Sequence, residues 1–251
     1  MGFDRFEGRV ALVTGGSNGI GAGVGERLRS RGASVVLADV DDAAGSAVAE
    51  RIGASFVHCD VRDLGDVERA VEATVARHGG LDLMFCNAGV TTGCGLGDDF
   101  DPASYRRAMA VNLDGVVFGI HAALPALRER GGGQIVATAS MAGIVAPAMD
   151  AVYVANKHAV VGLVRSLGAE YAGSGIAVNA LCPSFAETNI IEGIRPFLEE
   201  THFPILDVAD VVDAFFRIVE GDGTGECWYV IPGRESEPFR FRNAPGPRVD
   251  A

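Results

Sequence analysis

A tyrosine and a lysine that stand four residues apart on a helix can form an acid–base pair, and Tyr153 and Lys157 have this spacing. Lys157 is the only lysine in the chain, whereas twenty arginines carry the rest of the positive charge. A free phenol has a pKa of about 10 and is a weak base at neutral pH. An ammonium group about 4 Å away would favour the phenolate by about 4 kcal/mol at an effective dielectric constant of 20, which is about three pKa units. The pair therefore predicts a tyrosine whose pKa is lowered into the range of general acid–base catalysis.

A glycine-rich turn, VTGGSNGIG, stands near the N-terminus between a short apolar run and a helical pattern. Gly15, Gly19 and Gly21 would let backbone N–H groups and the positive end of the helix approach a pyrophosphate. The strand–turn–helix context favours a dinucleotide-binding turn over an ordinary glycine-rich loop. The residues predicted to bind the cofactor here are Thr14, Gly15, Ser17, Asn18, Gly19, Ile20 and Gly21.

Asp39 ends the second apolar run, twenty residues after Gly19. A carboxylate at this position can accept hydrogen bonds from both hydroxyls of an adenosine ribose. A 2′-phosphate would meet like charge, at a cost of about 4 kcal/mol per charge pair near 4 Å. Val40 follows the acid and Asn18 occupies the turn, so no basic residue is in place to offset that repulsion. The sequence therefore predicts NAD rather than NADP, and the alternative for Asp39 alone is a helix N-cap.

The elements that must position these residues alternate regularly along the chain. Apolar runs such as RVALVTG, SVVLAD, LDLMFCNAG and GQIVATAS are separated by stretches with helical periodicity. Apolar strands that alternate with helices predict a parallel sheet covered on both faces. We therefore predict an α/β protein with one Rossmann-type doubly wound domain over residues 1–233, containing about seven strands. Residues 234–251 are predicted to be a tail that is disordered or lies on a neighbouring subunit.

Composition disfavours several classes of function. An apolar content of 48% supports a large core, and a net charge of −12 disfavours binding to nucleic acid or to an anionic membrane surface. The N-terminus does not read as a signal peptide, and no apolar run approaches the 18 residues of a membrane span. The five cysteines are widely spaced without a C-x-x-C pair, which indicates reduced thiols in the cytoplasm and no metal site. They are Cys59, Cys86, Cys94, Cys182 and Cys227.

These motifs, in this order, resemble the classical short-chain dehydrogenase/reductase family from about Gly8 to Gly233. The glycine motif T-G-x-x-x-G-x-G is present, and the family's N-N-A-G appears as CNAG with Cys86 in the first position. Ser140 lies thirteen residues before Tyr153, as the family pattern expects. The other matching positions are Asp60 and Val61, then Asn87, Ala88 and Gly89, and the tetrad Asn112, Ser140, Tyr153 and Lys157.

The resemblance implies a role for each member of the tetrad. Tyr153 would exchange a proton with the substrate oxygen, and Ser140 would hydrogen-bond that oxygen. Lys157 would lower the tyrosine pKa and hold the nicotinamide ribose, while Asn112 would position a water that connects the lysine to solvent. Without the tyrosine–lysine pair, Ser140 would be interpreted as a helix cap and Asn112 as a polar helix residue.

The resemblance also implies contacts with the two ends of the cofactor, the adenine and the nicotinamide. Asp60 and Val61 would contact the adenine ring, and Val40, which follows Asp39, is also predicted to bind the cofactor. Pro183 and Thr188 would meet the nicotinamide, where Thr188 binds the carboxamide. The family usually has glycine after this proline, and Ser184 stands there instead, which puts the backbone contact at that point in doubt.

The segment from about residue 184 to residue 205 lies where this family has a mobile lid over the substrate. The side chains predicted to line the pocket are Met141, Val145, Met149 and Phe185, with Ile144, Ile190, Ile191, Phe197 and Phe203 as further apolar candidates. Half or more of these are expected to be plain core. They favour an apolar secondary alcohol or its ketone, while Arg195, the single cation of the lid, leaves a carboxylate-bearing substrate open.

The sequence as a whole predicts an NAD-dependent, cytoplasmic oxidoreductase that interconverts a secondary alcohol and its ketone, without metal, as a homodimer or homotetramer. Two alternatives stay open. The physiological direction could be ketone reduction, because the sequence fixes the catalyst and not the flux. The chain could also be a non-catalytic NAD(H)-sensing regulator that uses the fold for binding alone.

Overall fold

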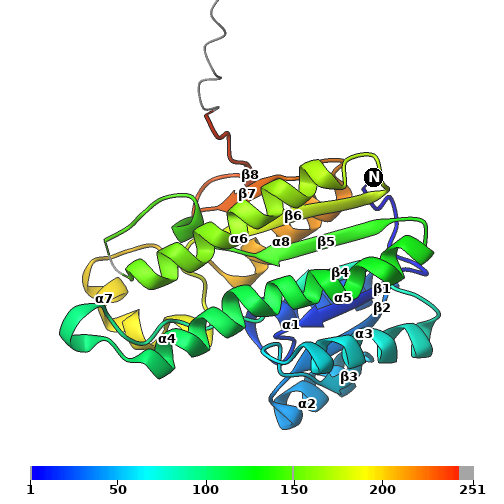
Figure 1. The fold of residues 1–251 in the computed structure, drawn as a ribbon, viewed down its shortest axis with the longest axis horizontal. Helices are drawn as coiled ribbons and strands as arrows, with labels where there is room; N and C mark the ends of the chain where they lie inside the picture. The colour runs from blue at the N-terminus through cyan, green and yellow to red at the C-terminus, as the bar shows by residue number, and fades with distance from the viewer. Residues whose placement is uncertain (1, 149, 243–251) are drawn as a thin grey trace, which may run out of the picture.

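The computed structural model describes residues 2–148 and 150–242, which form a single sheet with helices on both faces (Figure 1). The strand order is β3-β2-β1-β4-β5-β6-β7-β8, and β1 to β7 run parallel. The order reverses between β1 and β4, which is the switch point where doubly wound folds bind ligands. The strands are β1 (Val10–Thr14), β2 (Ser34–Asp39), β3 (Ser55–His58), β4 (Leu83–Cys86), β5 (Gly133–Thr138), β6 (Ile176–Pro183), β7 (Cys227–Val230) and β8 (Glu237–Pro238).

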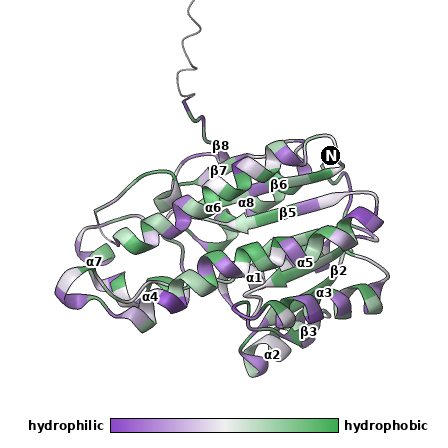
Figure 2. Ribbon diagram, viewed as in Figure 1, coloured by the Kyte–Doolittle hydropathy of each residue, from purple (hydrophilic) through white to green (hydrophobic). Residues whose placement is uncertain are grey.

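Two hydrophobic cores sandwich the sheet, one on each face, and the apolar sides of the helices turn toward it (Figure 2). One core packs α3, α5 and α6 against the sheet, and the other packs α1 and α8. The helices are α1 (Gly19–Ser30), α2 (Asp42–Ile52), α3 (Leu64–His78), α4 (Pro102–Met109), α5 (Gly115–Glu129), α6 (Ala151–Glu170), α7 (Arg195–Glu200) and α8 (Val208–Glu220). Helices α2, α3, α4 and α6 each follow an aspartate that accepts a hydrogen bond from the first turn.

The eighth strand corrects the predicted strand count and part of the predicted tail. β8 pairs antiparallel with β7, and the Phe239 N–H donates to the Cys227 carbonyl at 2.8 Å. The Arg165 guanidinium stacks 3.9 Å from the centroid of the Phe241 ring. A two-residue strand leaves no periodicity in the sequence, so only the fold reveals it. The tail therefore lies on its own chain up to residue 242, and residues 243–251 lie outside the described residues.

Helices α4 and α5 join through a π-helical segment, Ala110–Asp114, into one continuous helix from Pro102 to Glu129. An 18-residue window of this helix has a mean hydropathy of 1.4, so its length and composition suffice for a membrane span, contrary to the sequence prediction. In the structure α5 packs against α3 and β4. A core helix of a soluble protein meets the same criterion, so the hydropathy alone is weak support for a span.

Candidate active site

The glycine turn connects β1 to α1 and leaves the first turn of that helix without a side-chain cap. Gly15 and Gly19 have φ values of 64° and 51°, which glycine adopts without strain. A Cβ on Gly21 would lie 2.1 Å from the Gly15 carbonyl oxygen, and one on Gly15 would lie 2.9 Å from the Ala88 Cα. Asn18 precedes the helix and its side chain makes no capping bond. The uncapped backbone N–H groups of the first turn are suited to bind a phosphate. The structure adds that Gly15 and Gly21 are required by close packing within the protein itself.

Asp39 turns its carboxylate toward this turn. One oxygen accepts from the Ser17 N–H at 3.0 Å and the other from the Asp41 N–H at 3.1 Å. Asp41, and not Asp39, caps α2 through the Ala44 N–H. The alternative interpretation of Asp39 as a helix N-cap is therefore wrong. Val40 beside it is 57% exposed.

Asp60 and Val61 follow β3, at the same edge of the sheet. The Asp60 carboxylate accepts from the Arg62 Nε at 2.9 Å and from the Arg62 backbone N–H at 3.0 Å, and this guanidinium lowers the pKa of Asp60. Val61 is buried and packs where Gly115 of α5 leaves room for it. An adenine ring bound at this position would contact Asp60, whose carboxylate is already hydrogen-bonded to Arg62.

Asn87 links three strands of the sheet. Its Nδ2 donates to the Thr14 carbonyl at 3.1 Å and to the Gly15 carbonyl at 3.2 Å, while its Oδ1 accepts from the Thr138 hydroxyl at 3.1 Å. The Thr14 hydroxyl accepts in turn from the backbone N–H groups of Asn87 and Ala88. These bonds fix the end of β4 against the glycine turn before any ligand is present.

Asn112 lies in the π-helical segment, and its side chain is fully buried. Its Nδ2 donates to the Val90 carbonyl at 2.8 Å and its Oδ1 accepts from the Val90 N–H at 2.8 Å. A Cβ built on Gly89 would lie 3.3 Å from the Asn112 Oδ1 and 3.8 Å from the Lys157 Nζ, so both residues border this glycine. The amide is therefore committed to Val90, and a π-bulge at such a point is typical of functional sites.

Tyr153, Lys157 and Ser140 meet at the carboxyl ends of β5 and β6. Lys157 is buried, its Nζ lies 5.6 Å from the centroid of the Tyr153 ring and donates to the Thr138 carbonyl at 2.8 Å. The Ser140 hydroxyl accepts from the Ala142 N–H and donates to the Pro183 carbonyl at 3.4 Å. Ser140 thus caps the short helix Met141–Gly143 as well as facing the tyrosine. The three side chains that the sequence singled out do converge.

The pKa of Tyr153 is shifted in the direction opposite to the prediction. Burial raises it to about 12, the hydrogen bond with Ser140 opposes this rise, and the Asp150 carboxylate adds to it. Burial also lowers the pKa of Lys157 to about 8. The prediction from the ammonium alone had the wrong direction because desolvation of the phenolate is the largest influence on the pKa of Tyr153, and Lys157 is not among the groups that lower it.

A β-bridge joins the two ends of the lid. The Leu206 N–H donates to the Phe185 carbonyl and the Glu187 N–H to the Leu206 carbonyl, at 2.8 and 2.9 Å. A Cβ on Gly19 would lie 2.9 Å from the Thr188 Cγ2, so Thr188 stands directly over the glycine turn. Thr188 is therefore near the predicted cofactor site, as its proposed contact requires. Ser184 donates its N–H to the Val230 carbonyl at 2.9 Å.

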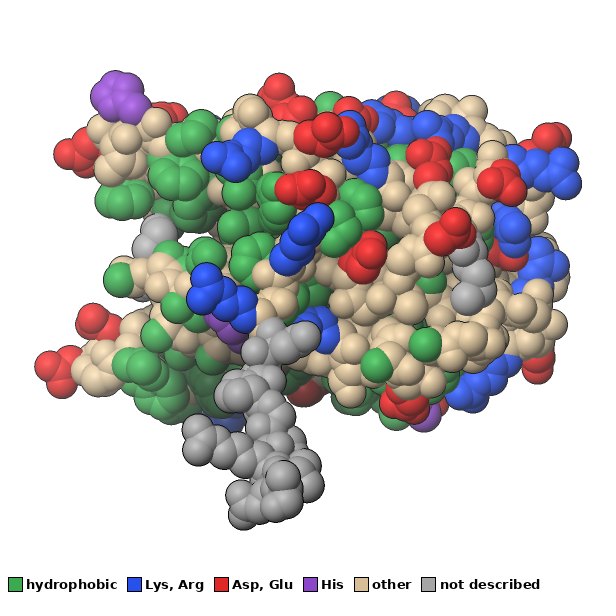
Figure 3. All heavy atoms as spheres, turned by 90° about the horizontal axis from the view of Figure 1, so that it is seen from above, with side chains coloured by type: hydrophobic (Ala, Val, Ile, Leu, Met, Phe, Trp, Pro, Cys, Tyr) green, Lys and Arg blue, Asp and Glu red, His purple; other side chains and the backbone are tan. Residues whose placement is uncertain are grey.

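The predicted substrate side chains divide into exposed and buried sets. Val145, Phe197 and Phe203 are 47%, 51% and 43% exposed, whereas Ile191 is fully buried and belongs to the core. Phe185 packs edge-on against Phe203 with ring centroids 5.2 Å apart. The end of the molecule that carries α4 and α7 is hollowed between two lobes, and apolar side chains gather on both (Figure 3). Met141 and Phe185 are half-buried, and Met149 lies outside the described residues.

Arg195 is not a free cation of the lid. Its guanidinium forms an ion pair with Glu187, and this contact lowers the pKa of the glutamate. This ion pair neutralises the charge of Arg195, which was the reason for keeping a carboxylate-bearing substrate as an alternative. Among the described residues, no group of three or more His, Cys, Asp or Glu side chains could hold a metal ion.

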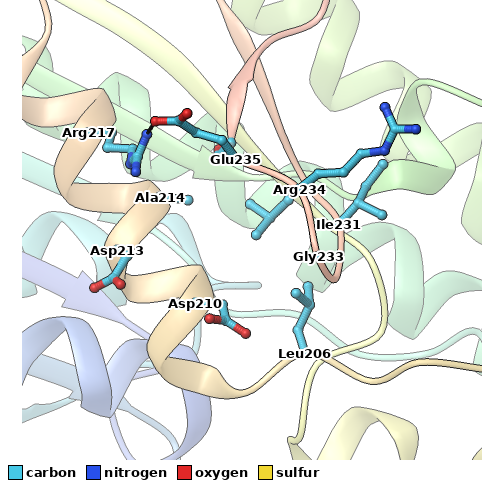
Figure 4. A pocket seen from close by; sticks show the side chains of 11 residues that line it. Leu206, Asp210, Asp213, Ala214, Arg217, Ile231, Gly233, Arg234 and Glu235 are labelled. Atoms are coloured by element: carbon cyan, nitrogen blue, oxygen red, sulfur yellow. Dashed lines mark hydrogen bonds and ion pairs between the residues drawn. The ribbon is translucent and has the colours of Figure 1, made fainter.

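Two cavities lie away from these residues. One, of about 350 Å³, lies between α8 and residues 231–236, where Arg217 and Glu235 form an ion pair on its wall (Figure 4). The other, of about 430 Å³, lies between α3 and α5. Neither includes a residue predicted to bind cofactor or substrate.

Two residues near the site were not singled out from the sequence. Asp150 caps α6 through the Tyr153 N–H, and an aspartate just before a helical pattern is a signal that could have identified it. Cys182 lies on β6, and its thiol is hydrogen-bonded to that of Cys227. This hydrogen bond and burial raise the pKa of the Cys182 thiol, while the charge of Lys157 opposes the rise. No motif marks Cys182, since only the sheet brings it under the lysine.

Comparison with known proteins agrees with this geometry. Residues 9–199 match the family model for short chain dehydrogenases. The chain is 41% identical over 192 residues to (+)-borneol dehydrogenase 1 of Salvia officinalis, covering 75% of this chain and 74% of that protein. It is 37% identical over 247 residues to zerumbone synthase of Zingiber zerumbet, covering 94% and 88%.

The solved structure of 3-ketoacyl-(acyl-carrier-protein) reductase from Brucella melitensis, complexed with NADH, is similar with a TM-score of 0.84 and 30% identity, covering 91% of this chain and 99% of that one. The glycine turn, the converging Tyr153, Lys157 and Ser140, and these matches agree on one conclusion. The chain belongs to the short-chain dehydrogenase/reductase family, and it is an oxidoreductase that uses a nicotinamide cofactor on alcohols or ketones.

Proposed function

We propose that this protein is an NAD-dependent oxidoreductase that interconverts an apolar secondary alcohol and its ketone. The observation that carries the proposal is the convergence of Tyr153, Lys157 and Ser140 at the edge of the sheet where the glycine turn lies. A phenol, a buried amine and a hydroxyl at this point can exchange a proton with a substrate oxygen and orient it.

NAD fits the groups that would hold it. The uncapped start of α1 suits the pyrophosphate, and the Asp39 carboxylate suits a ribose that carries two free hydroxyls. A 2′-phosphate would be repelled by Asp39. When bound, the nicotinamide ring accepts or supplies the hydride.

The proton is the protein's contribution. Tyr153 gives its phenolic proton to a ketone oxygen or takes one from an alcohol, while Ser140 hydrogen-bonds the same oxygen. Lys157, whose pKa burial lowers to about 8, exchanges protons close to neutral pH, and its Nζ lies 5.6 Å from the centroid of the Tyr153 ring. Asn112 keeps the adjoining loop in place through Val90.

An apolar substrate is supported by the exposed side chains of the lid and of the segment after Ser140. Val145, Phe197 and Phe203 would be covered by such a substrate, at a gain of about 25 cal/mol per Å² of apolar surface. The pairing of Arg195 with Glu187 disfavours recognition of a carboxylate. One relative is named for borneol, a bicyclic secondary alcohol, and apolar cyclic alcohols are therefore the first substrates to examine.

Ketone reduction is the second candidate for the physiological direction. The raised pKa of Tyr153 keeps its proton on the phenol at neutral pH, which is the form that a ketone oxygen requires. Cytoplasmic location and a homodimeric or homotetrameric assembly stay predictions, and light scattering on the purified protein would measure the latter.

A substrate screen tests the proposal. NADH absorbance would be followed with apolar, sugar and acidic alcohols and with the matching ketones, with Tyr153→Phe as the blank. We expect turnover of apolar substrates with NAD(H), and a loss of about 10²–10⁴-fold in the variant. Preference for charged substrates would overturn the substrate class, and tight NADH binding without any turnover would favour the non-catalytic regulator.

A further inference from the structure

The ends of β2 and β3 lie side by side at the edge of the sheet that carries the glycine turn. Asp39 at the end of β2 pairs in register with His58 of β3, and the Cys59 N–H donates to the Asp39 carbonyl at 2.9 Å. Neighbouring strands are about 4.8 Å apart, and a strand rises about 3.3 Å per residue. Asp60, two residues after His58, therefore lies next to the position where Asp39 would hold a ribose.

A dinucleotide bound across these strand ends has a fixed order of its parts. Its pyrophosphate would lie at the uncapped start of α1, and its ribose at the Asp39 carboxylate, which accepts from the Ser17 N–H of the same turn. The base leaves the ribose on the side away from the pyrophosphate, which is the side of β3. The adenine would therefore reach Asp60 and Arg62, in the segment that joins β3 to α3.

Arg62 already occupies the acceptor positions of the Asp60 carboxylate. Oδ1 accepts from the Arg62 backbone N–H at 3.0 Å, and the Arg62 Nε lies 2.9 Å from both carboxylate oxygens. The Arg62 Nη2 donates to Oδ2. These four contacts match the about four acceptor positions that a carboxylate has. The 6-amino group of an adenine would find no free acceptor on this side chain.

An exchange of Arg62 for the adenine amino group is unfavourable. The guanidinium brings a positive charge and two N–H groups in a planar fork, whereas the amino group is neutral. The backbone N–H of Arg62 also bonds the carboxylate from only two residues away, so the contact orders little additional chain. The Arg62 side chain is half-exposed, and a guanidinium packs well against the face of an aromatic ring.

We propose that Arg62 is a specificity-determining residue of the cofactor site, which blocks the Asp60 carboxylate and makes cofactor binding insensitive to the 6-amino group of the adenine. The base is then held by contact of its face with the guanidinium. The inference rests on the proposed NAD-binding function. Its consequence is that a nicotinamide dinucleotide whose purine lacks the amino group binds as well as NAD(H) does.

The test compares two reduced cofactors by fluorescence titration of the purified protein. One is NADH, and the other is the nicotinamide purine dinucleotide in which hydrogen replaces the 6-amino group. We expect the ratio of their dissociation constants to stay within about 3-fold in the wild type. In Arg62→Met the carboxylate is free to accept from the amino group, and the ratio should rise to about 10- to 100-fold in favour of NADH.

Two further variants separate this effect from a structural one. Arg69→Met removes a neighbouring arginine that pairs with Asp66 on α3, and it should keep the wild-type ratio. The double variant with Arg62→Met and Asp60→Ala should return to the wild-type ratio, because the acceptor is lost as well. A general loss of stability or of stacking affects both cofactors, so it does not change the ratio.

A wild-type ratio above about 3 would overturn the inference, and so would a ratio in Arg62→Met that stays below this value. A high ratio that persists in the double variant would equally contradict it, because the discrimination would then not come from Asp60. The titration needs no alcohol or ketone, so a failed substrate screen leaves its result intact. Failure of both cofactors to bind would instead contradict the NAD-binding function, and this inference with it.

Discussion

The cofactor half and the substrate half of this site are built differently. On the cofactor side, Asn87 and Asp39 fix the glycine turn through backbone hydrogen bonds, and Gly15 and Gly21 pack without space for a single methyl group. On the substrate side, the lid is tied at the bridge between its ends, and Phe197 and other apolar side chains stay exposed. The first half is thus formed before a ligand arrives. The second half retains apolar surface that a substrate can cover.

The largest effect is expected from a methyl group in the cofactor half. In Gly21→Ala the new Cβ would lie 2.1 Å from the Gly15 carbonyl oxygen and 2.8 Å from the Asn87 Nδ2, so the turn must move. We expect unfolding stability to fall by about 2–4 kcal/mol and NADH affinity to fall by about 100-fold. Thermal unfolding and fluorescence titration with NADH would measure both.

The matched control for this change is Gly162→Ala on α6, where a Cβ would meet nothing within 4 Å. Alanine there should stabilise the helix by about 0.5–1 kcal/mol and leave NADH affinity unchanged. Wild-type affinity in Gly21→Ala would show that the turn yields easily, and the contrast between the two halves would then not hold.

A smaller effect is expected when the charge of Asp39 is removed. Asparagine can still accept a hydrogen bond from the Ser17 N–H, but it no longer repels a 2′-phosphate. We expect Asp39→Asn to raise kcat/KM with NADP⁺ by about 10- to 100-fold and to lower it with NAD⁺ by about 10-fold. Steady-state kinetics with both cofactors would show this.

Asp41→Asn is the companion variant, since it removes a neighbouring charge while it preserves the cap of α2. It should leave the cofactor preference unchanged. An equal shift in both variants would mean that general surface charge, rather than the ribose contact of Asp39, selects the cofactor.

The smallest effect is expected in the substrate half. Phe197 is 51% exposed on α7, so Phe197→Asp should change stability by less than about 0.5 kcal/mol. If its ring covers an apolar substrate, KM for that substrate should rise by about 10-fold, with NADH affinity unchanged.

Phe239→Asp changes a phenylalanine beside β8 that is 37% exposed, and it should leave KM at the wild-type value. An unchanged KM in Phe197→Asp would remove α7 from the substrate pocket. A loss of NADH affinity in the same variant would instead show that the lid contributes to cofactor binding.

Much of the fold was predictable because local sequence patterns determine where its strands and helices form. The alternation of apolar runs and helical stretches predicted the parallel sheet, which the structure and the family comparison confirm. β8 was missed because two residues have no period, and the span-like hydropathy of the α4–α5 helix was missed because charged residues interrupt its apolar run. Ile191, predicted as pocket lining, is core, since helical spacing alone does not say which face is covered.

The residue types of the site were also predictable, whereas their energetics were not. Spacing alone placed Tyr153 and Lys157 on one face of a helix, and the glycine turn followed from its context. The pKa of Tyr153 depends on burial and on Asp150, so a pairwise estimate gave the wrong direction. The individual roles of these residues stay predictions until the variants are measured.

By itself, then, the sequence determined which chemical groups are present and in which order the chain presents them, because periodicity and turn chemistry act over a few neighbouring residues. Only the tertiary structure decided which groups lose water and which partners claim their hydrogen bonds, as for Asn112 with Val90 and Lys157 with Thr138. Desolvation and partner choice depend on contacts between residues far apart in the chain, and these decide the proton affinity of the site.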